Sequence, residues 1–599
     1  YEGPSALHFI FISTPLHSFP LHSQSHTMIV FYPAAIVALV SLVVVWVLRA
    51  RALTNKNNKI PNLPGLVPFA GNIALFTKPT SFIAMLEEAA ARCAIKSGLA
   101  AVRVPTLTNL WGKRFVLVDD VKVAKLILAR RPLTYDRPHV LLKALKGRLD
   151  GVKAPSVFSA LGQNEWGRAR RLVSPAFNHA NVQSMLPDCL DLAASVVQKW
   201  LTTSDDVSID SLETFNNLTF SVITRVGFGL SSVDTVRPDH QASLSDPREG
   251  APQPPPTLLN DVKDPIEFAG KWIRNPFAKY HDMIFARDEI AAITLSRKRL
   301  NKYFHDLLEF QQQQSSTNDD HSLINKLATS IDDTTNADNI KTSRKLTSEE
   351  VISNIMTFYF AGIDTTAIGL AWSVLFLAAD PDLQRRVAHE SREAGIAAWI
   401  EAELEKRVRL SPAEQNKMSS DELSSLSSSA HPLSDVSLTT LVSSYNNENP
   451  LRLAHGVFME ALRMHGPAPI LGAELAAESA ELAGETFKKG ELFFMMLRRM
   501  QMDSTYTPRA EEFLPERWTG EVPELEPAPE LKNVLSSLMF GGGPRVCPGR
   551  HLSELEASIT LSAICALLEL NPTSPELPPE ETVFTQKPES ANIRVTPRH

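Results

Sequence analysis

Cysteine is scarce in this sequence, with four residues in 599: Cys93, Cys189, Cys547 and Cys565. They lie far apart, and no two stand in a CxxC or other zinc-ligand spacing. This spread argues against a disulfide framework and favours a reducing compartment. Any chemistry at a cysteine must therefore depend on a single residue and its neighbours.

An excess of positive charge is also missing. The chain has 60 Lys and Arg against 67 Asp and Glu, a formal net charge of −7. This balance gives no basis for a nucleic-acid partner. With 44% hydrophobic and 21% charged residues, the chain has the composition of a globular protein with a large core.

Charge is absent altogether from residues 29–48, IVFYPAAIVALVSLVVVWVL. About 20 apolar residues in a helix cross the hydrocarbon core of a bilayer. Trp46 suits the headgroup level, and the basic Arg49 and Arg51 follow, which predicts a cytosolic C-terminal side. A buried helix or a cleaved signal peptide are the alternatives, but RAR follows the run where small residues would mark cleavage. We therefore expect a single-pass membrane anchor.

The segments on either side of this anchor differ in composition. Residues 1–28 are rich in His, Ser and Pro, and we interpret them as an untranslated or non-native leader before a start at Met28. Residues 49–72 are basic and contain Pro61, Pro64 and Pro68. Because proline fixes φ and removes an amide donor, they predict a stiff, non-helical linker.

Helical patterns predominate in residues 73–599. Examples are residues 121–131, 181–201 and 551–570, whereas strand candidates such as FVLV at 115–118 are short and scattered. We expect one mainly α domain with small β-sheets. Three polar segments near residues 232–264, 311–343 and 396–450 have too few apolar residues to offset their ordering entropy, and we expect them to be surface-loop insertions.

One cysteine lies in an unusual loop, FGGGPRVCPGR at residues 540–550. Its glycines permit tight turns, Arg545 and Arg550 supply positive charge, and a helical pattern begins directly afterwards, so a Cys547 thiolate would be favoured. One thiolate in such a loop suggests a single axial ligand to a flat, bulky cofactor. The other three cysteines are expected to be small buried hydrophobic residues.

Residues 347–381, TSEEVISNIMTFYFAGIDTTAIGLAWSVLFLAADP, predict a single long helix. Thr347 and Glu350 have the spacing of a capping box, and Asp380-Pro381 ends the pattern. Asp364 in its apolar middle argues against a membrane span, because an unpaired carboxylate in lipid is costly. We expect a buried helix in which Gly362 allows a close approach and the Thr365 hydroxyl locally opens the helix by bonding backward to its backbone.

Three further motifs carry paired charges or an aromatic–arginine pair. WGRARR (166–171) sets Trp166 and Arg170 four residues apart, and EALR (460–463) sets Glu460 and Arg463 three apart. FLPERW (513–518) contains Arg517. Such pairs are common on solvated helix faces, so their order along the chain carries more weight than any one of them.

Together these motifs resemble the cytochrome P-450 family. Phe540, Gly543, Arg545, Cys547 and Gly549 match its haem-ligand signature FxxGxRxCxG, although Ser553 stands where alanine is usual in the extended pattern. WGRARR, AGIDTT, EALR and FLPERW match its WxxxR, [AG]Gx[DE]T[TS], ExxR and PERW regions in the family's order. The resemblance covers residues 60–599 apart from the three polar segments and implies the cytochrome P-450 fold.

The resemblance also implies a cofactor and roles for individual residues. The cofactor would be haem b (iron protoporphyrin IX), with the Cys547 thiolate as axial ligand. Asp364 and Thr365 would deliver protons to dioxygen, and Glu460, Arg463 and Arg517 would form a buried charge network. Residues that would bind the cofactor or shape its site are Trp166, Arg170, Phe540, Gly543, Arg545 and Gly549. Many relatives carry a basic residue where this chain has Ala473, which leaves one haem propionate without its usual partner.

The implied function is that of a membrane-anchored, eukaryotic microsomal haem-thiolate monooxygenase, in the endoplasmic reticulum membrane with its catalytic domain facing the cytosol. It would insert one atom of O₂ into a lipophilic small molecule and reduce the other to water. NADPH-derived electrons would come from a separate NADPH-dependent flavoprotein reductase. Fatty acids, sterols and other terpenoids stay open as substrates.

Two other functions stay open as well. A haem-thiolate isomerase or dehydratase would use Cys547 without O₂, but such relatives usually lose the acid–alcohol pair that Asp364 and Thr365 form here. An inactive haem-binding protein would result if the 396–450 insertion disrupted folding or came from a faulty gene model.

Overall fold

The computed structural model divides the chain into two compact units, residues 1–58 and 59–599. All the described residues belong to the second unit, and the predicted leader, anchor and linker at 1–28, 29–48 and 49–72 lie outside them. The structure describes residues 86–87, 90, 99–106, 109–139, 142, 154–204, 206–228, 231–232, 244–245, 252–255, 257–265, 286–314, 323–335, 341–409, 449–532, 534–582 and 585–598.

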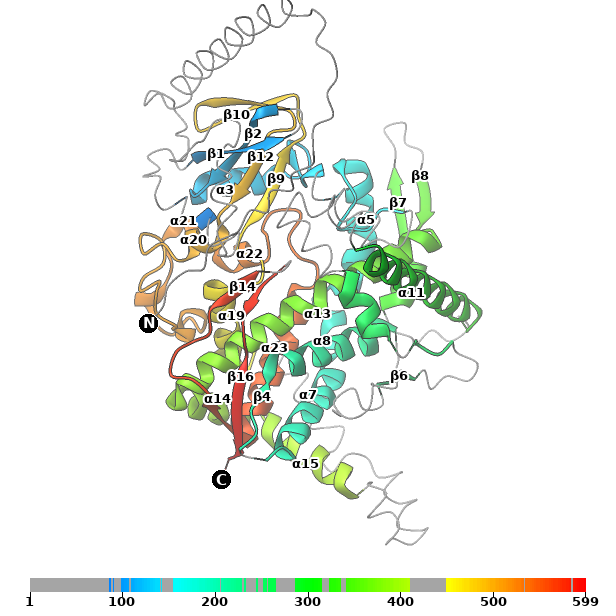
Figure 1. Cartoon of the computed structure of the whole chain (residues 1–599). Helices are drawn as coiled ribbons and strands as arrows, with labels where there is room; N and C mark the ends of the chain where they lie inside the picture. Colours follow the sequence, from blue (N-terminus) through cyan, green and yellow to red (C-terminus); the bar gives the residue numbers. More distant parts are fainter. Residues whose placement is uncertain are drawn as a thin grey trace, which may run out of the picture. The chain divides into compact units, whose positions relative to one another are not determined.

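Helix α13, Ser348–Ala379, is the long helix predicted from the sequence and lies in the middle of the helical part of this unit (Figure 1). Its start has the predicted capping box: Glu350 N donates to Thr347 Oγ1 at 3.2 Å, and Thr347 N donates to the Glu350 carboxylate at 2.8 Å. It ends at Ala379, with Asp380 as its C-cap directly before Pro381. The local signals at both ends therefore set the length of this helix.

Within the described residues, α13 is the one helix long and apolar enough to cross a membrane. It packs against α8 (Ser211–Phe228), α19 (Arg452–His465) and α23 (Arg550–Leu567), and two thirds of its most apolar window is buried. Gly362 and Gly369 allow this packing, because a Cβ there would overlap Ile223 of α8 and Phe458 of α19 respectively. Helix α13 is therefore a core helix, as predicted.

The other helices surround this core. One large cluster of buried apolar side chains includes residues of α7, α8, α13, α19 and α23, and a second lies between α3 and the largest sheet. The remaining helices are α3 (Val121–Ala129), α5 (Gly167–Val173), α6 (His179–Gln183), α7 (Leu186–Leu201), α11 (Arg287–Gln314), α12 (Leu323–Thr329), α14 (Pro381–Glu393), α15 (Ile396–Arg409), α20 (Leu497–Gln501), α21 (Pro529–Lys532) and α22 (Leu535–Met539).

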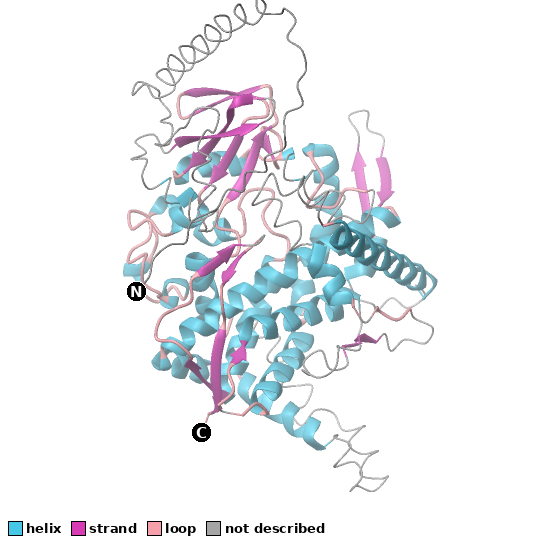
Figure 2. Cartoon of the chain, in the orientation of Figure 1, coloured by secondary structure: helices cyan, strands magenta, loops and turns pink. Residues whose placement is uncertain are grey.

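The strands form small sheets beside the helices (Figure 2). The largest has the order β1 (Leu99–Thr106), β2 (Asn109–Val118), β12 (Leu492–Met495), β9 (Leu471–Leu475), β3 (Tyr135–Asp136), in which only the β2–β12 pair is parallel. A second has the order β13 (Leu568–Pro572), β16 (Asn592–Pro597), β4 (Ile209–Asp210). Four two-stranded pairs are β5 (Ser231–Ser232) with β6 (Leu244–Ser245), β7 (Ile331–Thr335) with β8 (Lys341–Lys345), β10 (Ser479–Leu482) with β11 (Glu485–Lys488), and β14 (Glu580–Thr582) with β15 (Gln586–Pro588). The predicted class, mainly α with small β-sheets, is confirmed.

Two predicted helices have different bounds. The pattern at 181–201 is divided between α6 and α7, with Pro187 in the first turn of α7, where its missing N–H costs no helical bond. The pattern at 551–570 ends as a helix at Leu567, and the next residues form strand β13, paired with β16. Apolar periodicity alone did not distinguish the end of α23 from the strand that follows it.

The expectation of irregular loops was wrong for parts of all three polar segments. In 232–264, residues 258–264 are helical and bury Leu258 and Val262. The segment 311–343 contains α12 and most of the β7–β8 hairpin, because Leu323, Ile324 and Leu327 form a buried apolar face within a polar average. In 396–450, the first residues form α15, and residues 410–448 lie outside the described part.

Candidate functional site

The loop that carries Cys547 joins α22 to α23 and turns back on itself. Gly541, Gly542 and Gly543 have φ of +88°, +57° and +65°, and Cys547 N donates to Phe540 O at 2.9 Å across the turn. A Cβ on Gly543 would overlap the carbonyl oxygen of Leu128, so the loop rests directly on the end of α3. The predicted role of these glycines in tight turns and close approach is confirmed.

Gly549 differs from the other loop glycines. Its φ is −80°, so it needs no left-handed conformation, and it is the N-cap of α23. Its backbone N–H bonds to the sulfur of Cys547, and a Cβ there would lie 3.9 Å from that sulfur. Gly549 therefore contributes an amide donor beside the thiol rather than a turn. Ser553, the departure from the family pattern, donates its hydroxyl to Arg550 O at 2.9 Å and stays within the helix.

The arginines that flank Cys547 in sequence point to other partners. Arg545 is paired with Asp136 at 2.7 Å, donates to Ala160 O at 2.9 Å, and lies over the Trp166 ring at 4.7 Å. Arg550 donates to Glu554 at 2.8 Å and lies over the Phe540 ring. Both therefore fix the surroundings of the loop.

The sulfur of Cys547 lies where two opposing influences meet. Burial raises the pKa of the thiol, and the Gly549 N–H and the charges of Arg170 and Arg137 lower it without reversing the shift. In the protein without a ligand, burial thus opposes the predicted preference for the thiolate. A bound metal cation would deprotonate the thiol outright. Cys547 is exposed to solvent, whereas Cys189 and Cys565 are buried.

Trp166 and Arg170 come from one continuous helical stretch. Trp166 ends a π-helical turn, Gly162–Trp166, and Arg170 follows in α5. Arg170 Nη1 donates to Val546 O at 2.9 Å, directly before Cys547. The WxxxR motif therefore holds the cysteine loop, which argues against a purely solvated helix face.

The AGIDTT segment lies within α13 as a continuous α-helix, so the predicted local opening of the helix at Thr365 is wrong. Thr365 Oγ1 donates backward to Ala361 O at 2.7 Å, as the sequence predicted, and Thr219 Oγ1 of α8 donates to Ile363 O at 3.0 Å. Asp364 and Thr365 are both half-buried. Two carbonyl groups on this turn thus accept an extra hydroxyl hydrogen bond.

Glu460, Arg463 and Arg517 form the predicted network, and all three side chains are fully buried. Glu460 accepts two bonds from Arg463, at 2.8 and 2.9 Å, and one from Arg517 at 3.3 Å. Trp518 Nε1, which the sequence did not indicate, donates to the same carboxylate at 2.9 Å. The alternative of a solvated helix pair is excluded for these residues.

The structure adds residues that no sequence motif indicated. Asp136, on strand β3, accepts from Gly162 N at 2.7 Å and from Arg137 N at 2.8 Å, besides pairing with Arg545. Arg131 and Arg137 lie beside it, and burial lowers the pKa of Arg131 to about 10. We name Arg131, Arg137 and Arg545 with Asp136 the arginine cluster. The only sign of this cluster in the sequence was the high density of charged residues between Arg131 and Arg137.

The arginine cluster is the test of whether an anionic cofactor fits here. Arg545 Nε and Nη1 and Arg137 Nε are buried and have no hydrogen-bond partner among the described residues. Buried guanidinium groups normally have partners, so these donors fit the carboxylates of a cofactor such as haem. Cys547 fits its iron as a single ligand, and no group of three His, Cys, Asp or Glu side chains in the described residues forms another metal site.

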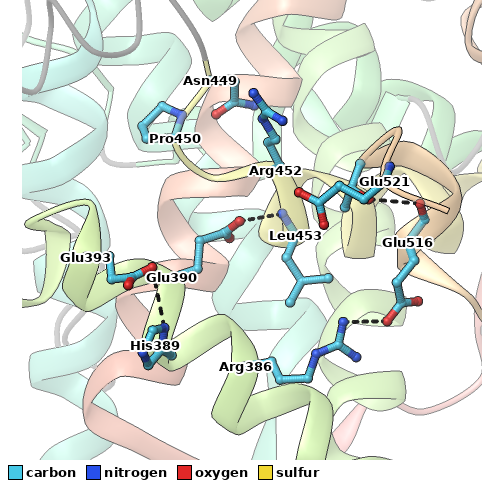
Figure 3. A pocket seen from close by; sticks show the side chains of 11 residues that line it. Arg386, His389, Glu390, Glu393, Asn449, Pro450, Arg452, Leu453, Glu516 and Glu521 are labelled. Atoms are coloured by element: carbon cyan, nitrogen blue, oxygen red, sulfur yellow. Dashed lines mark hydrogen bonds and ion pairs between the residues drawn. The ribbon is translucent and has the colours of Figure 1, made fainter.

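A separate pocket of about 820 Å³ lies between α14, the start of α19 and the Pro515–Trp518 turn (Figure 3). Its size is that of a small-molecule site, but its lining is charged, with Arg386 paired to Glu516 and His389 to Glu393. Glu390 in its wall accepts from Leu453 N at 2.6 Å. A residue of the pocket wall therefore fixes the start of α19, the helix that carries Glu460. The charged lining of the pocket does not fit a lipophilic ligand.

The comparisons with known proteins all point to the same family. The family model described as Cytochrome P450 matches residues 107–398 and 442–595, and the unmatched stretch between them falls within the 396–450 segment. A self-sufficient cytochrome P450 monooxygenase CYP505E5 of Aspergillus kawachii is 25% identical over 448 residues, which cover 73% of this chain and 35% of the relative. Cytochrome P450 3A31 of Mesocricetus auratus is 23% identical over 417 residues, 68% of each chain. Putative cytochrome P450 CYP13A5 of Caenorhabditis elegans is 23% identical over 477 residues, 75% of this chain and 78% of the relative.

The chain thus spans about a third of the length of the self-sufficient relatives that it matches. The family model, by contrast, matches most of the chain and includes both the α13 segment and the cysteine loop. With its loop geometry, its buried Glu460 network and this match, the chain belongs to the cytochrome P450 family.

Proposed function

We propose that this protein is a haem-thiolate monooxygenase in which Cys547 ligates the iron of haem b. The observation that carries the proposal is the cysteine loop, which presents one solvent-accessible thiol beside buried guanidinium donors that have no partners among the described residues. A flat cofactor with an iron centre and two carboxylates matches both features. When bound, haem supplies the activation of O₂, and the residues below position it and move protons.

Several residues would hold the cofactor without reacting. Arg545 offers a propionate two nitrogen atoms that have no partner in the described part of the chain, while Asp136 and the Trp166 ring fix its guanidinium group. Arg170 fixes the backbone at Val546. Phe540, Gly543 and Gly549 shape the loop so that Cys547 stays in place.

Asp364 and Thr365 would form the proton relay. The Thr365 hydroxyl uses its hydrogen in the bond to Ala361 O, so its oxygen remains free to accept a hydrogen bond from a water molecule. The carboxyl group of the preceding residue, Asp364, can carry the proton to be delivered. This pair supports oxygen chemistry over the isomerase or dehydratase alternative.

A lipophilic small molecule is the proposed substrate. Aromatic side chains connect the segment after residue 154 to α13 just before AGIDTT: Phe158 lies 6.1 Å from Phe360, and Phe177 lies 4.9 Å from Phe358, between ring centroids. These contacts supply apolar surface next to the proposed relay. Fatty acids, sterols and other terpenoids all offer the apolar surface that such contacts would bind.

The proposed electron source is a separate NADPH-dependent flavoprotein reductase. The names of the Aspergillus relatives describe them as self-sufficient, so electron supply within one chain is the alternative to be separated. We further propose an endoplasmic reticulum membrane location, with residues 29–48 as the anchor; a variant without residues 1–51 should leave alkaline-washed membranes yet keep its haem.

An inactive protein is disfavoured by the packing around the 396–450 insertion. Trp399 and Ile400 on its first side and Leu451 beyond its end are all buried in the core. Arg407 of α15 also bonds to Ser195 of α7 at 2.9 Å. The insertion therefore leaves the core packing on both of its sides intact.

The experiment that tests the function is an oxygen-labelling assay on the full chain loaded with haem. A spectral-shift screen of lipophilic compounds first identifies a ligand, which is then incubated with NADPH and isotopically labelled O₂, with and without an added reductase. We expect one labelled oxygen atom in the product, and only with added reductase. Turnover without O₂ would establish the isomerase or dehydratase alternative, and turnover without added reductase would overturn the separate electron source.

A further inference from the structure

The turn of α13 that carries Asp364 and Thr365 receives a hydrogen bond from a neighbouring helix that the proposed function has not yet used. Thr219 of α8 is fully buried, and its hydroxyl oxygen lies 3.0 Å from Ile363 O and 3.1 Å from Asn216 O. A hydroxyl group has one hydrogen, which these two carbonyls share in a three-centre bond. The nearer carbonyl belongs to α13 and lies 144 residues away in sequence, so no local pattern indicates this contact.

Helices α8 and α13 lie in close contact at this turn. A Cβ on Gly362 would lie 2.3 Å from Ile223 Cδ1, so the glycine allows the approach. About one turn earlier on α13, Tyr359 OH lies 3.1 Å from the hydroxyl of Thr224, which is also fully buried on α8. Two buried hydroxyl bonds thus join the same pair of helices, and of these two the Thr219 bond is the one that reaches the backbone of the AGIDTT segment.

The Thr219 bond acts on the peptide group directly before the relay. The Ile363 carbonyl and the Asp364 amide belong to one planar peptide group, so a hydrogen bond to Ile363 O fixes the orientation of the backbone at Asp364. In an α-helix the same oxygen also accepts from the N–H four residues later, and the Thr219 hydroxyl then uses its second lone pair. A water molecule beside this turn is therefore left with the Thr365 oxygen as its acceptor rather than the Ile363 carbonyl.

We propose that Thr219 is a positioning residue for the proton relay: its hydroxyl fixes the Ile363–Asp364 peptide group and directs water to the Thr365 oxygen. The proposal rests on the proposed function, because Thr219 transfers no proton itself and acts through Asp364 and Thr365. The alternative is a structural bond that holds α8 against α13 and has no effect on proton delivery. The experiment must separate these two roles.

The test measures coupling, the product formed per NADPH consumed, in the haem-loaded full chain with an added reductase. Thr219→Val keeps nearly the same shape but removes the hydroxyl. Its coupling should fall about five-fold, the factor expected for one lost hydrogen bond, with peroxide in place of product. Thr219→Ser keeps the hydroxyl and should stay near the wild-type value. Thr224→Val is the matched control, because it removes the other buried hydroxyl bond between the same helices, and it should leave coupling unchanged.

Unfolding in urea separates positioning from packing. Thr219→Val and Thr224→Val each remove one buried hydroxyl bond, so their free energies of unfolding should fall by similar amounts while only Thr219→Val loses coupling. Equal loss of coupling in the two variants, or wild-type coupling in Thr219→Val, would overturn the proposal. If Thr219→Val does not fold, as judged by circular dichroism, Thr219→Ala takes its place, since it also lacks the hydroxyl and introduces no bulk.

A double variant shows whether Thr219 acts through the relay. Thr219→Val/Thr365→Ala should couple about as poorly as Thr365→Ala alone, because the water position that Thr219 serves is already lost. Losses that multiply in the double variant would overturn the proposal, since Thr219 would then act elsewhere. Wild-type coupling in Thr365→Ala, or turnover without O₂, would instead refute the proposed function, and the role of Thr219 with it.

Discussion

Two groups of buried arginines differ in what supplies the hydrogen-bond partners of their guanidinium groups. Around Glu460, the arginines find their partners within the protein: Arg463 and Arg517 bond to the carboxylate and to backbone carbonyls such as Pro508 O, at 2.8 Å. In the arginine cluster, Arg545 and Arg137 keep buried nitrogen atoms without partners among the described residues. Both groups have more arginines than carboxylates, so charge alone does not distinguish them.

The difference lies in backbone carbonyl groups. Arg463 is surrounded by loops that turn their carbonyls toward it, from Gln501 and Glu512, each within 3.3 Å. Arg545 receives one such carbonyl, from Ala160, and Asp136. The first group is complete without a ligand and has a structural role, whereas the second leaves donors for a ligand. Buried donors without partners next to a reactive side chain therefore identify a cofactor site better than buried charge does.

The largest expected effect comes from removing the carboxylate of the Glu460 group. Glu460→Ala leaves two buried arginines without their carboxylate, and we expect a loss of about 3–5 kcal/mol in the free energy of unfolding, measured in urea. Asp382→Ala is the matched control, since Asp382 and Arg385 have the same i,i+3 spacing at 3.0 Å but are exposed, and it should cost at most about 1 kcal/mol. Equal costs for the two variants would show that the Glu460 group is not a closed buried network.

Changes on α13 should spare both groups and act on turnover. Thr365→Ala should uncouple the enzyme, so that NADPH is consumed and peroxide appears in place of product, and Asp364→Asn should slow turnover about 10²–10⁴-fold. Ser373→Ala is the control, because Ser373 makes the same backward bond on α13, to Gly369 O at 2.8 Å. Coupling at the wild-type level in Thr365→Ala would remove the relay role.

Gly543→Ala should shift the cysteine loop and leave the Glu460 group unchanged. The new Cβ meets both a positive φ and the Leu128 carbonyl, so we expect a loss of about 2–4 kcal/mol in unfolding free energy together with faster haem release. Gly520→Ala separates the two causes, because Gly520 has φ +76° but open space around it. It should cost about 1–2 kcal/mol and leave haem release unchanged; faster release in this variant would show that the Leu128 contact is not what holds the loop.

The smallest change, taken per pH unit, concerns a buried acid. Burial raises the pKa of Glu556 to about 8 from 4.5, and its Oε1 has no partner among the described residues. Between these two values the folded state keeps a proton that the unfolded state releases, so stability falls as pH rises, by at most about 1.4 kcal/mol per unit. Glu556→Gln should flatten this fall between pH 5 and 8 in urea titrations, whereas the exposed Glu569→Gln should not. An unchanged slope in Glu556→Gln would assign the pH dependence to other groups.

The sequence predicted best what depends on neighbouring residues. Thr347 and Glu350 are three residues apart, so the start of α13 could be predicted from capping chemistry. The same holds for the turns at Gly541–Gly543 and for the Glu460–Arg463 pair, although only the resemblance to a family indicated that this pair is buried. The anchor at 29–48 and the domain boundaries stay predictions.

What the sequence did not predict depends on contacts over long distances in the chain. Asp136 and Arg545 are far apart in sequence, and β3, which places Asp136, has only two residues. No periodicity can indicate so short a strand, because its partner β9 defines it. Helix α12 was missed for a related reason: its apolar face is buried by the rest of the domain, and its polar neighbours hid this face in the average composition.

The measurement that tests the central claim most directly is the carbon monoxide difference spectrum of haem-loaded cysteine variants. Cys547→Ser should lose the thiolate band, while Cys189→Ser and Cys565→Ser, which change buried thiols, should keep it. Cys93→Ser should keep it as well. An intact thiolate band in Cys547→Ser would contradict the account, because the loop, the arginine cluster and the proposed oxygen chemistry all depend on this one sulfur.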